Sequence, residues 1–147
     1  MSFQVQSIIV IDDQEEIRTS IEAILSDEGF LVETAKNGKE AINASKTTQF
    51  DLAIVDIKLP DIEGTELLRK LRDNQPKMAT LIVTGQPSLE NAIKSVNNKA
   101  DGYLLKPFEP RTLIETIRKI LAEKSSAYFQ MYAEVERAKQ NQFGIRI

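Results

Sequence analysis

Short apolar runs alternate with stretches of helical periodicity along most of the chain. The runs cover residues 8–11, 30–35, 52–55, 80–83 and 103–105. Between them, apolar residues recur three or four positions apart, as in an amphipathic helix. Five such strand–helix units with short connections predict an α/β fold with a parallel sheet covered by helices on both faces. The first, third and fourth runs are the most continuously apolar, so they are expected to be central strands.

The chain after Pro110 follows a different pattern. Pro110 occupies a favoured position in the first turn of a helix, and neither glycine nor proline occurs again before Gly144. Two series with seven-residue spacing follow: Ile114, Leu121, Tyr128, Val135 and Ile117, Lys124, Met131, Ala138. A fifth unit requires this helix only to about residue 121. We therefore expect a domain over residues 1–122 and a helical extension over residues 123–147.

Three interpretations of the extension remain open. It folds back on its own domain, it docks on a second copy or another protein, or it is a frayed end or linker. Isolated helices of this length are marginal in water, which favours packing against something. Four of the nine aromatic residues lie in this segment: Tyr128, Phe129, Tyr132 and Phe143.

Composition narrows the classes of function. The chain has 147 residues, 41% hydrophobic and 28% charged, and a net charge of −3, which fits a single globular domain and gives no reason to expect nucleic-acid binding. It contains no cysteine and no histidine, which excludes disulfides, thiolate chemistry and a histidine base or phosphohistidine of its own. The N-terminus does not resemble a signal peptide, and no apolar run is long enough to span a membrane. A cytoplasmic protein is expected.

The candidate chemistry lies where the predicted strands end. Asp12 and Asp13 follow the first run, Asp56 the third, Thr84 the fourth and Lys106 the fifth. Taken singly, an acidic pair before a helix is typical of a helix cap, and the others are typical of turns or solvated surface. In a parallel sheet, however, the carboxyl ends of these strands meet at one edge. Three carboxylates there repel one another unless a cation compensates them.

Phosphoryl transfer to a carboxylate fits this set. Asp56 is the predicted nucleophile. Oxygen ligands suit Mg²⁺, with Asp13 and Asp56 binding directly and Asp12 through a water. The Lys106 ammonium would neutralise the transferred oxygens, and the Thr84 hydroxyl would donate to the attached phosphoryl group.

Four segments carry a resemblance to a known family. They are Ile-Ile-Val-Ile-Asp-Asp ending at Asp13, Asp-Ile-Lys-Leu-Pro-Asp-Ile-Glu-Gly from Asp56, Leu-Ile-Val-Thr-Gly ending at Gly85, and Tyr-Leu-Leu-Lys-Pro-Phe from Tyr103. In this order, they resemble the receiver domain of two-component response regulators over roughly residues 5–122. The resemblance implies a flavodoxin-like fold with strand order 2-1-3-4-5.

The resemblance also implies functional details. Asp56 would accept a phosphoryl group from a sensor histidine kinase or a phosphotransfer protein, with Mg²⁺ as cofactor and the Lys58 main-chain carbonyl as a further ligand. Lys106-Pro107 would be a cis peptide. Thr84 and Tyr103 would reorient on phosphorylation and reshape the face formed by helix 4, strand 5 and helix 5 for partner binding or dimerisation.

Two positions are expected to tune the loss of phosphate. Lys58 and Gln86 flank the site in the family, and a lysine does not activate water as a base, so we expect slow self-dephosphorylation. Lys58 also counts against an aspartate-nucleophile phosphatase, which usually carries a second acid two residues after the nucleophile. A phosphorelay intermediate and a receiver-fold module that binds without phosphorylation remain as alternatives.

Overall fold

The computed structural model describes residues 5–85 and 88–142 and contains five strand–helix units in alternation. The strands are β1 (Ser7–Ile11), β2 (Leu31–Ala35), β3 (Leu52–Asp56), β4 (Ala79–Thr84) and β5 (Gly102–Leu105). The helices are α1 (Glu15–Asp27), α2 (Gly38–Thr47), α3 (Gly64–Asn74), α4 (Leu89–Asn97) and α5 (Pro110–Gln142).

One parallel sheet in the order β2-β1-β3-β4-β5 holds all five strands. The three most apolar runs are the interior strands β1, β3 and β4, as expected, because a strand covered on both faces has no side that tolerates polar residues. The flavodoxin-like fold and its strand order are confirmed.

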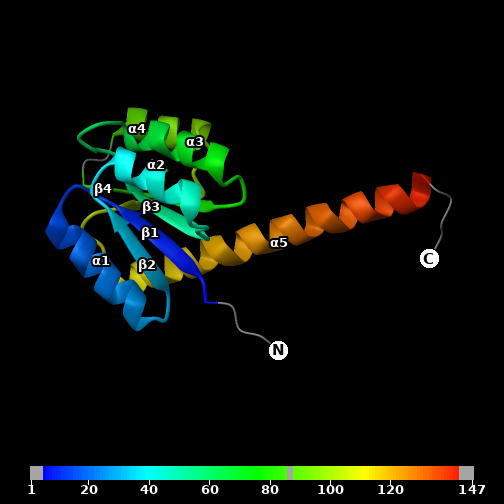
Figure 1. The fold of residues 1–147 in the computed structure, drawn as a ribbon, viewed down its shortest axis with the longest axis horizontal. Coiled ribbons are helices and arrows are strands. Elements are labelled where there is room, and N and C mark those ends of the chain that lie inside the picture. The colour runs from blue at the N-terminus through cyan, green and yellow to red at the C-terminus, as the bar shows by residue number, and fades with distance from the viewer. Residues whose placement is uncertain (1–4, 86–87, 143–147) are drawn as a thin grey trace.

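Two apolar cores separate the sheet from its helices. In Figure 1, α1 and α5 lie on one face, and α2, α3 and α4 lie on the other. Alternate residues of each strand point to opposite faces. In β1, for example, Ile8 and Val10 belong to the core under α1 and α5, whereas Ile9 and Ile11 belong to the core under α2 and α3.

Helix α4 departs from the simple amphipathic pattern. Its apolar residues Leu89, Ile93 and Val96 do recur at helical spacing, but 79%, 50% and 75% of their surfaces are exposed. The side chain that α4 buries is that of Ser95, whose hydroxyl donates to the Asn91 carbonyl. The apolar stripe of α4 therefore faces outward. Which side chains of α4 are buried depends on how the helix packs on α3, not on its sequence pattern.

Helix α5 divides into a packed half and a projecting half. Leu113, Ile117, Ile120 and Leu121 are buried against the sheet. Beyond Leu121, none of the side chains that the structure describes is buried, and the helix runs away from the domain (Figure 1). The extension does not fold back on its own domain as far as residue 142.

Some of the aromatic residues predicted to lie on the extension fall outside the described part of the structure. Phe143 lies beyond the described residues, and the side chains of Tyr128, Phe129 and Tyr132 also fall outside the description, although their backbone is helical. Within the described residues, no helix combines the length and apolar character needed to cross a bilayer.

Candidate functional site

The acidic residues converge at the carboxyl edge of the sheet. Asp12 and Asp13 follow the last residue of β1, and Asp56 ends the neighbouring strand β3. One carboxylate oxygen from each of the three lies within 4.8 Å of the others. The parallel sheet thus brings Asp12 and Asp56 together, although they are 44 positions apart in the sequence.

Lys106 is the cation that faces this cluster. It follows β5, which is separated from β1 by β3 and β4. Its Nζ lies 2.7 Å from Asp12 Oδ2 and 3.8 Å from Asp56 Oδ2. The side chains of Lys106, Asp12 and Asp56 are only 14%, 4% and 12% exposed. Lys106 with Asp12 and Asp56 leaves one excess negative charge in a poorly solvated place, and the exposed Asp13 lies beside it.

Burial alters the acidity of Asp56. Burial, the largest cause, raises the pKa of the Asp56 carboxyl above its usual 3.8. The nearby Lys106 ammonium opposes that shift, Asp12 adds to it, and the Lys58 N–H opposes it. A carboxylate held in this way gains from any added cation, because the cation stabilises its charged form.

Asp12 is fixed by the start of α1. Its Oδ1 accepts a hydrogen bond from the Gln14 N–H at 2.9 Å, while its Oδ2 faces Lys106. The Arg18 guanidinium donates to the Asp12 carbonyl at 2.7 Å. The acidic pair is therefore both a helix-start feature and part of the site. Arg18 was not anticipated; an arginine one turn into the helix after an acidic pair was the available signal.

A close backbone approach fixes the loop after β3. The Gly64 N–H donates to the Ile57 carbonyl at 2.8 Å, and a Cβ at Gly64 would lie 2.3 Å from the Asp56 carbonyl oxygen. Only glycine fits there without shifting the backbone that carries Asp56. The Lys58 N–H also lies 3.4 Å from Asp56 Oδ1.

Asp61 is a second structural residue that the sequence did not reveal. Its carboxylate accepts from the Gly38 and Lys39 N–H groups at 2.9 and 3.0 Å. These donors belong to the first turn of α2, where a negative charge is favourable. The Gly38 N–H, the largest cause, lowers the pKa of Asp61 below its usual 3.8. The loop that follows Asp56 is thereby tied to α2.

Of the remaining predicted residues, Thr84, Lys106 and Pro107 lie at the same edge, whereas Tyr103 lies near the start of β5. Thr84 is the buried last residue of β4, and its carbonyl accepts from the Lys106 N–H at 2.8 Å. The Lys106–Pro107 peptide bond is cis. Tyr103 is half-buried, and its hydroxyl is enclosed without a hydrogen-bond partner among the described residues. Burial raises the pKa of Tyr103. Gln86 lies outside the described residues.

The donor set suits a hard divalent cation. Mg²⁺ binds carboxylate oxygens and retains several waters, so it does not need a closed protein cage. Asp12, Asp13 and Asp56 offer three such oxygens at the rim of the sheet, with Asp13 exposed to solvent. The excess negative charge gives the physical reason for a cation to bind.

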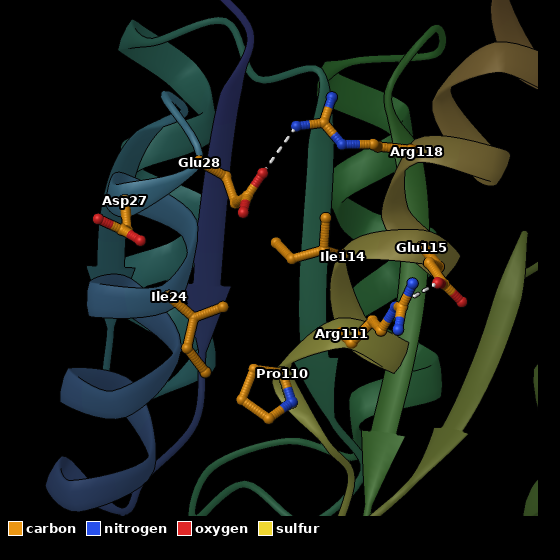
Figure 2. Close-up of a pocket in the computed structure, with 8 residues that line it drawn as sticks. All are labelled: Ile24, Asp27, Glu28, Pro110, Arg111, Ile114, Glu115 and Arg118. Atoms are coloured by element: carbon orange, nitrogen blue, oxygen red, sulfur yellow. Dashed lines mark hydrogen bonds and ion pairs between the residues drawn. The ribbon is translucent and has the colours of Figure 1, made fainter.

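A groove of about 500 Å³ lies elsewhere, between α1 and α5. Figure 2 shows Ile24 and Ile114 pointing into it from opposite helices. Its charged residues already pair with each other, Glu28 with Arg118 at 3.0 Å and Arg111 with Glu115 at 3.1 Å. None of the acidic-edge residues lines it. The groove is therefore separate from the candidate chemistry.

Comparison with known proteins agrees with this geometry. The model of the response regulator receiver domain family matches residues 8–118. The cell cycle response regulator CtrA of Brucella ovis is 36% identical over 114 residues, which is 78% of this chain and 49% of that protein. The chain thus spans about half the length of the curated relatives that it matches.

Solved structures show the same likeness. A CheY-like receiver domain protein from Methanospirillum hungatei JF-1 superposes with a TM-score of 0.82 and 42% identity, covering 84% of this chain and 99% of that one. A Burkholderia pseudomallei response regulator, solved with a phosphorylated aspartic acid, calcium ion and citrate, has a TM-score of 0.74 and 26% identity, covering 92% and 86%.

The fold and the acidic edge define a receiver module of signal transduction. The chain belongs to the response regulator receiver domain family, whose members act in two-component systems.

Proposed function

We propose that the protein is a phosphorylation-switched response regulator whose Asp56 accepts a phosphoryl group from a sensor histidine kinase or a phosphotransfer protein. The observation that supports this most directly is the cluster of Asp12, Asp13 and Asp56 facing Lys106. Such a cluster is costly for folding alone, because like charges repel. Family members are signalling modules rather than turnover enzymes, and a cytoplasmic location goes with this proposal.

The transfer is a displacement at phosphorus. An ionised Asp56 oxygen forms the new P–O bond, the P–N bond of the donor's phosphohistidine breaks, and the imidazole nitrogen keeps the bonding pair. The Lys106 ammonium, 3.8 Å from Asp56 Oδ2, neutralises the transferred oxygens. Mg²⁺, held by Asp13 and Asp56 with Asp12 through a water and with the Lys58 carbonyl, would neutralise the remaining charge.

The switch would run through Thr84 and Tyr103. Thr84 ends β4, the strand beside Asp56, so its hydroxyl is a candidate donor to a phosphoryl group on Asp56. The Tyr103 hydroxyl has no hydrogen-bond partner among the described residues, which leaves its present rotamer without a polar anchor. Phosphorylation then biases a population between two arrangements of α4, β5 and α5.

The exposed apolar stripe on α4 supports an output role for that face. Leu89, Ile93 and Val96 are exposed, and Leu105 on β5 is 47% exposed. Exposed apolar residues grouped on adjoining elements are typical of a protein interaction surface. We propose that this face, together with the C-terminal helix, binds a second copy or a downstream protein, and that residues 1–122 form the receiver unit.

The lifetime of the phosphoryl group is expected to be long. Lys58 offers no base to activate water, and Gln86 is the second position proposed to tune the rate. The decay of the phosphorylated form, followed by intact mass, would be slow in the isolated protein. A rapid loss that Lys58→Ala leaves unchanged would contradict this role for Lys58.

The decisive experiment measures intact mass after incubation with Mg²⁺ and acetyl phosphate. We expect a gain of about 80 Da, for one phosphoryl group, that disappears with EDTA and in Asp56→Asn. Asp73→Asn removes an exposed carboxylate of α3 and is the matched control, expected to gain the same mass. No gain, even with a sensor kinase as donor, would favour a receiver-fold module that binds without phosphorylation.

A further inference from the structure

Arg18 ties the turn between β1 and α1 to the helix that follows. Its guanidinium is partly buried and donates to the Asp12 carbonyl at 2.7 Å. Its N–H closes the first turn of α1 by donating to the Gln14 carbonyl at 3.1 Å. Gln14 precedes α1 but provides no side-chain cap. The Arg18 side chain therefore supplies the side-chain contact that joins the turn to the start of α1.

Asp13 is the residue of this turn whose carboxylate is open to a cation. Both oxygens of the Asp12 carboxylate are engaged, Oδ1 with the Gln14 N–H and Oδ2 with Lys106, and the side chain is 4% exposed. Asp13 is exposed, and one of its oxygens lies within 4.8 Å of oxygens of Asp12 and Asp56. Because packing does not hold an exposed side chain, the direction of this carboxylate depends mainly on the backbone at Asp13.

The contact with Arg18 fixes that backbone. Asp12 is held on its amino side by its N–H, which donates to the Ala35 carbonyl at 3.1 Å. Rotation about the Cα–C bond of Asp12 would move its carbonyl oxygen and the Cα of Asp13 together, because the peptide group is planar. A guanidinium that holds the oxygen therefore also holds the Asp13 Cα. The helix that carries Arg18 is a firm support, since Leu25 on α1 is fully buried in the core.

Helix stability does not explain an arginine at this position. Arg18 is the fourth residue of α1, near the end where a helix carries a partial positive charge. A cation there is unfavourable, and the acidic residues of this turn, Glu15 and Glu16, have the sign that the helix favours. The contact with the Asp12 carbonyl is the interaction that offsets this unfavourable charge.

We infer that Arg18 is a positioning residue for the divalent cation: through the Asp12–Asp13 peptide, it holds the Asp13 carboxylate beside Asp56. This inference rests on the metal site of the proposed function and adds to it a residue that does not itself bind the cation. Removing a group that orients a metal ligand commonly weakens metal binding by about 10- to 100-fold. Because Mg²⁺ keeps several waters and takes few protein ligands, we expect the lower end of that range.

The charge of Arg18 alone would have the opposite effect. The guanidinium is a cation close to an acidic cluster, so its removal makes the site more negative and should tighten Mg²⁺ binding. Loss of the contact that positions Asp13 should weaken Mg²⁺ binding instead. The direction of the change in affinity therefore separates the two roles.

Calorimetric titration of the unphosphorylated chain with Mg²⁺ tests the inference without a phosphodonor. Arg18→Met removes the donor and the charge but keeps an unbranched stem, and we expect the dissociation constant for Mg²⁺ to rise about tenfold. Arg118→Met is the matched control. It removes an arginine that donates to Glu28 at 3.0 Å, beyond the opposite end of α1, and should leave the constant unchanged. An unchanged or lower constant in Arg18→Met would overturn the inference.

A second pair of variants shows whether Arg18 acts through Asp13. Melting temperatures over a series of Mg²⁺ concentrations report weak affinities and, without metal, show whether each variant is folded. In an Asp13→Asn background, Arg18→Met should cause no further loss of Mg²⁺ affinity, because the carboxylate that Arg18 positions is already absent. A further loss of about tenfold in that background would rule out a role through Asp13.

The titration also keeps this inference apart from the proposed function. A wild type that binds no Mg²⁺ would overturn the metal site and, with it, the role of Arg18. If the wild type binds Mg²⁺ and Arg18→Met binds it equally well but melts at a lower temperature, the arginine is a structural contact only, and the role of Arg18 alone is overturned.

Discussion

Two part-buried ion clusters lie at opposite edges of the sheet, and their charge balance differs. At the carboxyl edge, Lys106 pairs with Asp12 and Asp56, and Asp13 adds a third carboxylate within 4.8 Å of those two. At the amino edge, Asp101 is the carboxylate between two cations, 3.4 Å from Arg72 and 3.6 Å from Lys124. The first cluster is left ready for an added cation or phosphoryl group. In the second cluster the positive charges outnumber the carboxylate, and its ion pairs hold α3, the turn before β5 and α5 together.

Hydrogen bonds add to the ion pairs of the amino-edge cluster. Asp101 accepts from the Thr80 N–H at 2.9 Å and from its hydroxyl at 3.2 Å. Arg72 donates to the Asn98 carbonyl at 3.0 Å and also to the Lys99 carbonyl. The Arg72 Nε is buried and has no hydrogen-bond partner among the residues that the structure describes. These contacts join α3, β4, the turn before β5 and the base of the C-terminal extension.

The largest effect on stability is expected from Lys106→Met. It removes the cation at the carboxyl edge and leaves Asp12 and Asp56 buried with uncompensated charge, which should cost about 3 kcal/mol in the free energy of unfolding. Denaturant unfolding measures this loss. Added Mg²⁺ should restore part of it, because a metal ion replaces the missing positive charge.

A surface pair gives the control for that prediction. Lys36 lies 3.9 Å from Glu40 with both side chains largely exposed, so Lys36→Met should change stability by at most about 0.5 kcal/mol. If Lys106→Met and Lys36→Met lowered the free energy of unfolding equally, burial would not make the carboxyl-edge ion pairs stronger than an exposed pair.

Asp101→Asn is expected to lower the free energy of unfolding by about 2 kcal/mol, somewhat less than Lys106→Met. The loss is smaller because the Asp101 side chain is 25% exposed and the amide of asparagine keeps an acceptor for Thr80. Unlike Lys106→Met, this variant should not respond to Mg²⁺. If Mg²⁺ restored the stability of Asp101→Asn, the two ion clusters would not be independent, which would contradict the difference between the two edges.

Asp56→Asn is expected to raise the melting temperature at neutral pH. The raised pKa of Asp56 means that the folded state retains its proton to higher pH than the unfolded chain. The stability gained from that proton is present below about pH 3.8 and is lost as the pH rises through the folded pKa. The asparagine is neutral throughout, so its advantage should appear at pH 7 without metal and vanish below about pH 3.8.

Melting curves at both pH values, with and without Mg²⁺, test this prediction. Mg²⁺ should raise the melting temperature of the wild type more than that of Asp56→Asn, because the metal favours the ionised carboxylate. A wild type that melts higher than the variant at neutral pH without metal would contradict the charge excess at this edge.

A small effect, comparable with the Lys36→Met control, is expected from Asp61→Ala, which removes the carboxylate from the first turn of α2. The exposed, solvent-screened group should contribute about 0.5 kcal/mol. Its lowered pKa gives the opposite pH dependence to Asp56: its contribution is present above about pH 3.8 and is lost as the pH falls through the folded pKa. If the wild type and Asp61→Ala differed by the same free energy of unfolding at pH 7 and at acid pH, the Asp61 carboxylate would not stabilise the first turn of α2.

Much of the fold was predictable because strand composition reports burial. The uninterrupted apolar runs predicted that β1, β3 and β4 are the interior strands, since only strands covered on both faces are apolar throughout. The acidic pair and Asp56 were recognisable because they end strands, and parallel strands end at one edge. Asp61 was not recognisable and Arg18 was missed, because their partners are backbone atoms whose position depends on the fold.

The sequence by itself determined the strand–helix alternation, the strands that lie inside and the residues that meet at the acidic edge, because periodicity and strand ends are local properties of the chain. Only the tertiary structure decided that the apolar stripe of α4 faces outward while that of α3 is buried. It also decided that Asp101 holds Lys124 where α5 leaves the domain. Which face of a helix is covered depends on where its neighbours lie, and the pattern of a single segment does not contain that information.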